Sequence, residues 1–174
     1  MKTLTDHLAQ YAAYHRDPRN LLSHFIGIPM IVLAVAVLLS RPGIEAFGLW
    51  LSPVVPVALA ATLFYLRLDF RFALLMGAAL LLCVWIGAGL AQQSTAAWLS
   101  AGAGLFVVGW IIQFVGHYFE GRKPAFVDDL TGLIIGPLFV AAELGFLLGM
   151  REPLRQAIEA RVGPVRLRQR PIDA

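Results

Sequence analysis

Three of the four histidines in this chain, His15, His24 and His117, carry side chains that could bind a metal ion. His117 lies near the end of a run of 48 residues, from Phe72 to Phe119, that contains no Asp, Glu, Lys or Arg. A run of that length predicts two membrane spans in succession. A polar group at that depth is costly, so it marks a candidate functional site. Neutral imidazoles bind iron, zinc and copper alike.

The composition is that of an integral membrane protein. Of the 174 residues, 59% are hydrophobic and 14% are charged, whereas a soluble domain carries about a quarter charged residues. The length predicts a single all-α transmembrane domain over residues 1–174. The net charge of +3 comes from basic residues in loops and termini. That distribution favours contact with the anionic surface of a lipid bilayer and gives no sign of nucleic-acid binding.

Windows without charged residues predict a helical bundle with about four full spans. Each window is close to the ~20 residues that cross the hydrocarbon core. The second span is expected to be kinked near its two prolines, Pro53 and Pro56. A polar turn at 91–96 is expected to separate the third span from the fourth. The predicted spans are Asn20–Ser40, Ala46–Leu66, Phe72–Leu90 and Ala97–Phe119.

A fifth apolar segment, Leu130–Met150, is followed by an arginine-rich tail. A full crossing would place the basic tail outside, so we expect a broken or re-entrant element, interrupted at Gly136-Pro137. The tail, residues 151–174, is roughly amphipathic near its start and suits a helix on the membrane surface.

The distribution of basic residues predicts the orientation of the bundle. Basic side chains precede the first span and follow the second and the fourth, whereas the opposite side has only Arg41. The N-terminal segment 1–19 is therefore expected to be cytoplasmic. The preference for Arg and Ala over Lys is compatible with a bacterial protein, which would place the chain in the inner membrane.

This topology brings the three histidines to one membrane face. His15 and His24 flank the start of the first span, and His117 lies at the end of the fourth, all on the cytoplasmic side. Asp17 suits the N-cap of the first span and Pro18 its first helical position. Three protein ligands would leave open coordination positions, as in a catalytic metal site.

Nearby polar side chains are candidates for a fourth ligand or for hydrogen bonds that orient the imidazoles. Asn20 is four residues before His24, and Glu120 is three residues after His117, so each pair shares a helix face. Asp128 follows within reach of the same surface. Spacing alone leaves simpler roles open, because an interfacial histidine often only caps a helix. In that reading the basic residues only anchor the chain at the interface.

Two sequence blocks around these residues resemble the Mpo1-like proteins. The first reads Tyr11-x-x-Tyr14-His15-x-x-Pro18-x-Asn20-x-x-x-His24-x-x-Gly27-x-Pro29. The second runs from Gly109 through Gln113, His117 and Glu120 to Leu130. The resemblance extends from Tyr11 to about Met150. The chain departs from the family pattern at Arg16-Asp17, at Asp129 and in the interval between His117 and Glu120.

The resemblance implies an iron(II)-dependent dioxygenase that shortens 2-hydroxy fatty acids by one carbon, in fatty-acid α-oxidation. It also implies that His15, His24 and His117 are essential and hold the Fe(II). A 2-hydroxy acid would then chelate the metal and leave one position for O2. The substrate carboxylate could pair with a basic side chain at this face. The candidates are Arg16, Arg19, Arg122 and Lys123.

Other classes of function make different demands on the sequence. Di-iron membrane hydroxylases carry many more histidines than the four found here, which argues against that class. A small multi-span protein without enzymatic activity stays open as an alternative. It could be a bis-histidine haem or electron carrier, or a transporter subunit with Gln113 and Glu143 along its path. The residues themselves do not choose between iron and zinc, and they leave the oligomeric state open.

Overall fold

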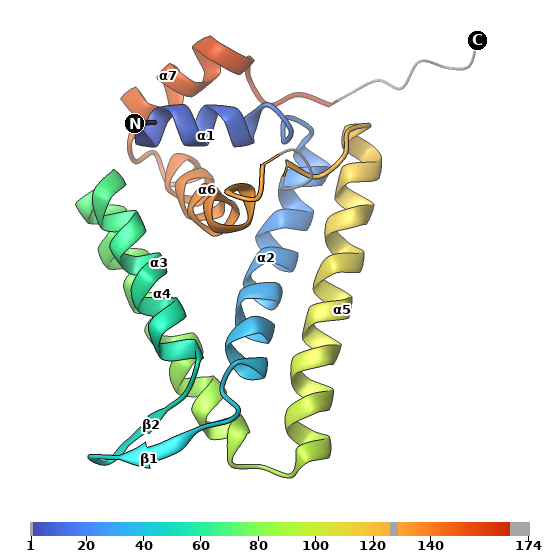
Figure 1. Cartoon of the computed structure of the whole chain (residues 1–174). Helices are drawn as coiled ribbons and strands as arrows, with labels where there is room; N and C mark the ends of the chain where they lie inside the picture. The colour runs from blue at the N-terminus through green and yellow to red at the C-terminus, as the bar shows by residue number, and fades with distance from the viewer. Residues whose placement is uncertain (1, 126–128, 168–174) are drawn as a thin grey trace. The chain divides into compact units, whose positions relative to one another are not determined.

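The computed structural model describes residues 2–125 and 129–167, and helices make up most of it (Figure 1). The predicted all-α class is confirmed. The chain divides into two compact units, residues 1–28 with 111–174 and residues 29–110, and the long helices α2 and α5 each contribute to both. The helices are α1 Leu4–Ala12, α2 Pro18–Leu38, α3 Val54–Leu68, α4 Phe70–Ala91, α5 Thr95–Glu120, α6 Gly132–Leu147 and α7 Glu152–Val162.

Among the described residues, three helices, α2, α4 and α5, are long and apolar enough to cross a membrane. They have 21, 22 and 26 residues, so each reaches the length that a span needs. Helices α6 and α7 form a pair bent by 114°, which is either one broken span or a re-entrant element. The predicted turn at 91–96 is shorter in the structure, where only residues 92–94 lie between α4 and α5. These helices support the predicted membrane bundle.

The predicted second span, Ala46–Leu66, is wrong at its start. Residues Ile44–Ala46 (β1) and Leu49–Leu51 (β2) form a two-stranded antiparallel hairpin instead. Helix α3 begins only at Val54, and its 15 residues fall short of a full span. Pro53 precedes the helix and Pro56 lies in its first turn, where a missing N–H costs no hydrogen bond. The two prolines therefore mark a helix start and not a kink.

The fifth apolar segment is broken, as predicted, but at a different place. Helix α6 continues through Pro137, so the predicted interruption at Gly136-Pro137 is wrong. The break lies between α6 and α7, where Gly149 and Arg151 both have positive φ. Gly136 instead permits close packing, because an added Cβ would lie 2.9 Å from the Tyr11 hydroxyl oxygen. The predicted C-terminal helix is present as α7.

Helix α1 lies within the segment that was expected only to be cytoplasmic. A capping box begins it, because Thr3 accepts the N–H of Asp6 while Asp6 accepts the N–H of Thr3. The helix packs against α6 and α7, as Figure 1 shows. Asp6 also pairs with Arg161 of α7 at 2.8 Å. These contacts place the end of α1, just before His15, over buried residues of α6.

Candidate metal centre

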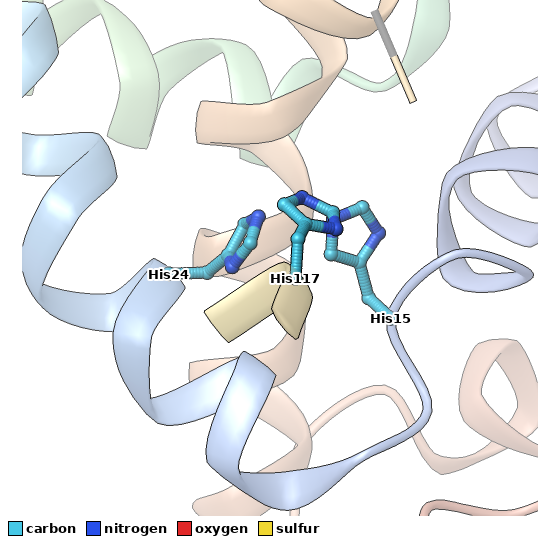
Figure 2. A group of neighbouring side chains, drawn as sticks. All are labelled: His15, His24 and His117. Atoms are coloured by element: carbon cyan, nitrogen blue, oxygen red, sulfur yellow. The ribbon is translucent and has the colours of Figure 1, made fainter. Parts of the chain in front are cut away.

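The three histidines that the sequence singled out meet in one cluster (Figure 2). His15 comes from the loop between α1 and α2, His24 from α2 and His117 from α5. One ring nitrogen of each lies within 4.8 Å of those of the other two. Their ring centroids are 4.3 to 5.1 Å apart, and the ring planes are steeply inclined to one another. The three imidazoles could therefore share one metal ion.

Backbone carbonyls orient two of the imidazoles. Nδ1 of His15 lies 2.7 Å from the carbonyl oxygen of Tyr11, and Nδ1 of His24 lies 2.8 Å from that of Asn20. When Nδ1 carries the proton and donates it to the carbonyl, Nε2 keeps a lone pair for a metal. Within the described chain, Nε2 of His15 and Nδ1 of His117 are buried without a hydrogen-bond partner. These features fit a metal held by three nitrogens.

The surroundings of His15 favour the neutral imidazole that a metal requires. The side chain is completely buried. Burial, reinforced by the neighbouring His24 ring, holds the pKa of His15 well below its usual range. The imidazole is therefore uncharged at neutral pH.

Two aromatic rings fix the plane of His15. Tyr11 stacks on it with a centroid distance of 4.2 Å and an interplanar angle of 4°. Phe139 of α6 lies 4.9 Å from the Tyr11 ring and 5.6 Å from the His15 ring. Sequence reasoning did not assign Tyr11 to the site, although its position four residues before His15 was visible. Both aromatic side chains are buried, so they also keep water from this side of the cluster.

Glu120 binds the loop that carries His15. Its Oε2 accepts the backbone N–H of Arg16 at 3.0 Å and that of Asp17 at 2.8 Å. The same oxygen accepts the side-chain amide of Asn20 at 3.1 Å. The carboxylate is buried, with 1% exposed. These contacts hold the loop and the start of α2 against the end of α5. Glu120 therefore supports the positions of His15 and His24 from α5, the helix that carries His117.

Asn20 completes this support, and Gly116 allows it. The side-chain amide of Asn20 donates to the backbone carbonyl of Tyr14 as well as to Glu120. The backbone carbonyl oxygen of Asn20 lies beside Nδ1 of His24. A Cβ at Gly116 would overlap Ser23 Oγ and lie 2.6 Å from Asn20 Oδ1. Only glycine therefore lets α5 approach α2 this closely, one residue before His117. The role of Gly116 was not recognised from the sequence.

Comparisons with known proteins point to one family. Residues 1–148 match the family described as 2-hydroxy-palmitic acid dioxygenase Mpo1-like. The chain belongs to the Mpo1-like family. It is 35% identical over 158 residues to the Saccharomyces cerevisiae (strain ATCC 204508 / S288c) protein named 2-hydroxy-palmitic acid dioxygenase MPO1. The match covers 90% of this chain and 87% of that relative. No solved structure matches the chain. The resemblance inferred from the sequence blocks is confirmed. His15, His24 and His117 lie within residues 1–148, the part of the chain that the family model matches.

The basic side chains of this Mpo1-like protein differ in their surroundings. The Arg16 guanidinium is buried and pairs with Glu143 of α6 at 2.9 Å. It also donates to the carbonyls of Ala12, His15 and Gly163. Its hydrogen bonds thus bind the loop that carries His15 to α6 and to the segment after α7. From the sequence, Glu143 was a lone carboxylate in an apolar segment with no predicted partner.

The other basic candidates lie nearer the surface. Arg19 pairs with Asp17 at 2.7 Å and lies over the Phe119 ring. Arg122 and Lys123 are exposed just beyond α5, and Arg122 donates to the carbonyl of Ala13. In this Mpo1-like chain, Asp128 lies outside the described residues.

Proposed function

We propose that this protein is an iron(II)-dependent dioxygenase that shortens 2-hydroxy fatty acids by one carbon, a reaction of fatty-acid α-oxidation. The observation that carries the proposal is the cluster of three buried imidazoles. Its support from comparison is the 35% identical relative that is named a 2-hydroxy-palmitic acid dioxygenase. The membrane setting agrees, because a long-chain acid partitions into the bilayer that the apolar helices would cross.

The donor set fits Fe(II), which His15, His24 and His117 would hold. Imidazole accepts iron, zinc or copper, so the preference for iron comes from oxygen chemistry and not from the ligands alone. When bound, iron would supply open coordination positions for O2 and for the oxygens of a 2-hydroxy acid. The chain's own part is to keep three neutral nitrogens in place. Tyr11 and Phe139 would exclude water from one side, and Glu120 would fix the loop.

The overall reaction balances without a further oxidant. One R–CH(OH)–COOH and one O2 yield one R–COOH, one CO2 and one H2O. C2 rises from the alcohol to the carboxyl level and C1 leaves as CO2, which together release the four electrons that reduce O2. A reducing cosubstrate is therefore not required.

Placement of the substrate follows from charge and hydropathy. Arg122 and Lys123, exposed at the end of α5 near the histidine cluster, would attract the carboxylate. Arg16 and Arg19 already have carboxylate partners within the protein, so we leave them out of this proposed contact. The acyl tail would lie among the apolar helices. By the positive-inside rule this end of the bundle would face the cytoplasm of a bacterial cell, beneath the inner membrane.

A bis-histidine haem is less compatible with the cluster. Two axial imidazoles must lie on opposite faces of a flat porphyrin. Here every pair of ring centroids is within 5.1 Å, which is too close for a porphyrin to lie between any two of the imidazoles. The cluster is therefore better suited to a single ion.

Turnover by purified protein tests the proposal. Iron-loaded protein in detergent should consume one O2 per 2-hydroxypalmitate and yield the fatty acid that is one carbon shorter. Zinc-loaded protein should consume none, because zinc has no redox chemistry. Palmitate should not be shortened by the iron form. A well-folded, iron-loaded sample that leaves 2-hydroxypalmitate unchanged would overturn the proposed function.

A further inference from the structure

Gln113 is a buried amide that lies one helical turn from the metal cluster. Only 3% of it is exposed, and its Nε2 has no hydrogen-bond partner within the described chain. A buried donor without a partner costs free energy, so such a group calls for an explanation. An apolar side chain of similar size would fill this position without that cost.

The position of Gln113 follows from the packing around His117. The two residues are four apart in α5, so they share one face of the helix. On that face His117 meets His24, and the adjacent Gly116 abuts Asn20 and Ser23. Gln113 therefore lies one turn farther from the end of α5 than the cluster does. This is the side toward the apolar span, opposite to Arg122 and Lys123.

We infer that Gln113 binds the 2-hydroxyl group of the substrate and determines the preference for 2-hydroxy acids. The inference rests on the proposed function, because it assumes that substrate class. With the carboxylate drawn toward the basic end of α5, C2 and its hydroxyl lie on the side of the acyl tail, where Gln113 is. The atom of Gln113 without a partner is the donor Nε2, and a hydroxyl oxygen at that place would accept its hydrogen bond.

The consequence is discrimination against acids that lack the hydroxyl. A site built to hydrogen-bond a hydroxyl rejects the analogue without it, because the amide then stays unsatisfied. The unpartnered Nε2 would donate to the hydroxyl oxygen on binding. Gln113 is a specificity residue in this arrangement and needs no contact with the metal.

Ligand binding to zinc-loaded protein tests the inference without turnover. Calorimetry in detergent would compare 2-hydroxypalmitate with palmitate for the wild type, Gln113→Leu and the exposed control Gln93→Leu. Wild type and control should prefer 2-hydroxypalmitate. In Gln113→Leu the affinity for 2-hydroxypalmitate should fall about tenfold, while the affinity for palmitate should not change. Zinc content should be equal in all three proteins.

The thermal midpoint of the metal-free protein separates this role from a structural one. Gln113→Leu removes an unsatisfied buried donor, so its midpoint should equal or exceed that of the wild type. A lower midpoint with loss of zinc would overturn the inference in favour of a structural role. An unchanged preference in Gln113→Leu would overturn the inference alone. A wild type that binds both acids equally would instead overturn the proposed substrate class, and the inference with it.

Discussion

The Glu120 carboxylate accepts the backbone N–H of Asp17 at 2.8 Å, which joins the last residue of α5 to the residue before α2. The same oxygen accepts the N–H of Arg16, so two successive residues after His15 are bound to one atom. Glu120 is thus one of the contacts that hold the loop of His15 against the end of α5, the helix that carries His117.

Replacing Glu120 should weaken metal binding and stability together. Glu120→Ala leaves two backbone N–H groups and the Asn20 amide without their shared acceptor in a buried place. We expect metal affinity to fall about 10- to 100-fold. The free energy of unfolding should fall by about 2–3 kcal/mol. Glu120→Gln keeps one carbonyl acceptor, so its metal affinity and stability should lie between those of the wild type and of Glu120→Ala.

Iron titration and denaturant unfolding in detergent measure these effects. Glu45→Ala, at an exposed position of the β1–β2 hairpin, is the matched control and should change neither. A Glu120→Ala protein that binds iron as tightly as the wild type would show that the loop holds its position without the carboxylate.

Removal of each clustered histidine should remove the metal. His15→Ala, His24→Ala and His117→Ala each delete one of three nitrogens, and two remaining imidazoles hold iron weakly. We expect bound iron to drop from about one per chain to near zero after desalting, as measured by atomic absorption. His7→Ala should keep its iron, because His7 is outside the cluster. A variant that retains stoichiometric iron would remove that histidine from the ligand set.

The meeting of the three histidines could be predicted from the sequence, and the reason is the membrane. Charge-free windows fix where the chain crosses, so residues at window ends share a depth even when they are about 100 positions apart. His15, His24 and His117 are such residues. The family pattern then added the expected metal. Charge-free windows do not predict the direction of a side chain or the partner of a charged group.

The errors have the same physical origin. The run Ala46–Leu66 is apolar enough for a span, but hydropathy does not distinguish a hairpin followed by a short helix from one continuous helix. Gly136-Pro137 has the composition of a break, whereas the glycine accommodates the Tyr11 side chain. Arg16 was a reasonable substrate cation until the fold brought Glu143 beside it from 127 residues away.

Alanine at Gly116 should separate α5 from α2. Its methyl group would overlap Ser23 Oγ and press on Asn20 Oδ1. Overpacking of this kind costs about 1–3 kcal/mol, and the displacement should also weaken iron binding. Gly104→Ala on the same helix meets no atom within 4 Å, so its stability should be unchanged or slightly higher. Thermal unfolding and iron titration of both variants check this, and equal midpoints would contradict it.

The contact of α1 with α7 should weaken in acid. Hydrogen bonds from Thr3 and then from Arg161 hold the pKa of Asp6 below its ordinary value of 3.8. A depressed carboxyl pKa stabilises the fold above 3.8, and this contribution is lost as the pH falls below that value. Asp6→Asn should therefore be less stable than the wild type at pH 7, with a smaller difference at pH 3. Thermal midpoints at the two pH values measure this, and a gap that widens in acid would contradict it.

The buried pair of Arg16 and Glu143 should show strong coupling. Glu143→Leu leaves the Arg16 guanidinium buried without its counter-charge, which costs about 3 kcal/mol or more. Arg16→Met removes the buried counter-charge of Glu143 and also removes hydrogen bonds to three carbonyls, so it should cost at least as much. The double variant removes both charges and should be less destabilised than the sum of the two single variants. Denaturant unfolding of all four proteins gives the coupling free energy.

The same cycle separates the charge pair from the metal site. Arg16 follows His15 directly, and its guanidinium binds the His15 carbonyl, so Arg16→Met should weaken iron binding even in the double variant. Glu143→Leu alone should leave the carbonyl contacts of Arg16 in place and have the smaller effect on iron. Additive losses of stability would contradict the coupling of the pair. Equal losses of iron in the two single variants would show that the carbonyl contacts of Arg16 do not position the loop of His15.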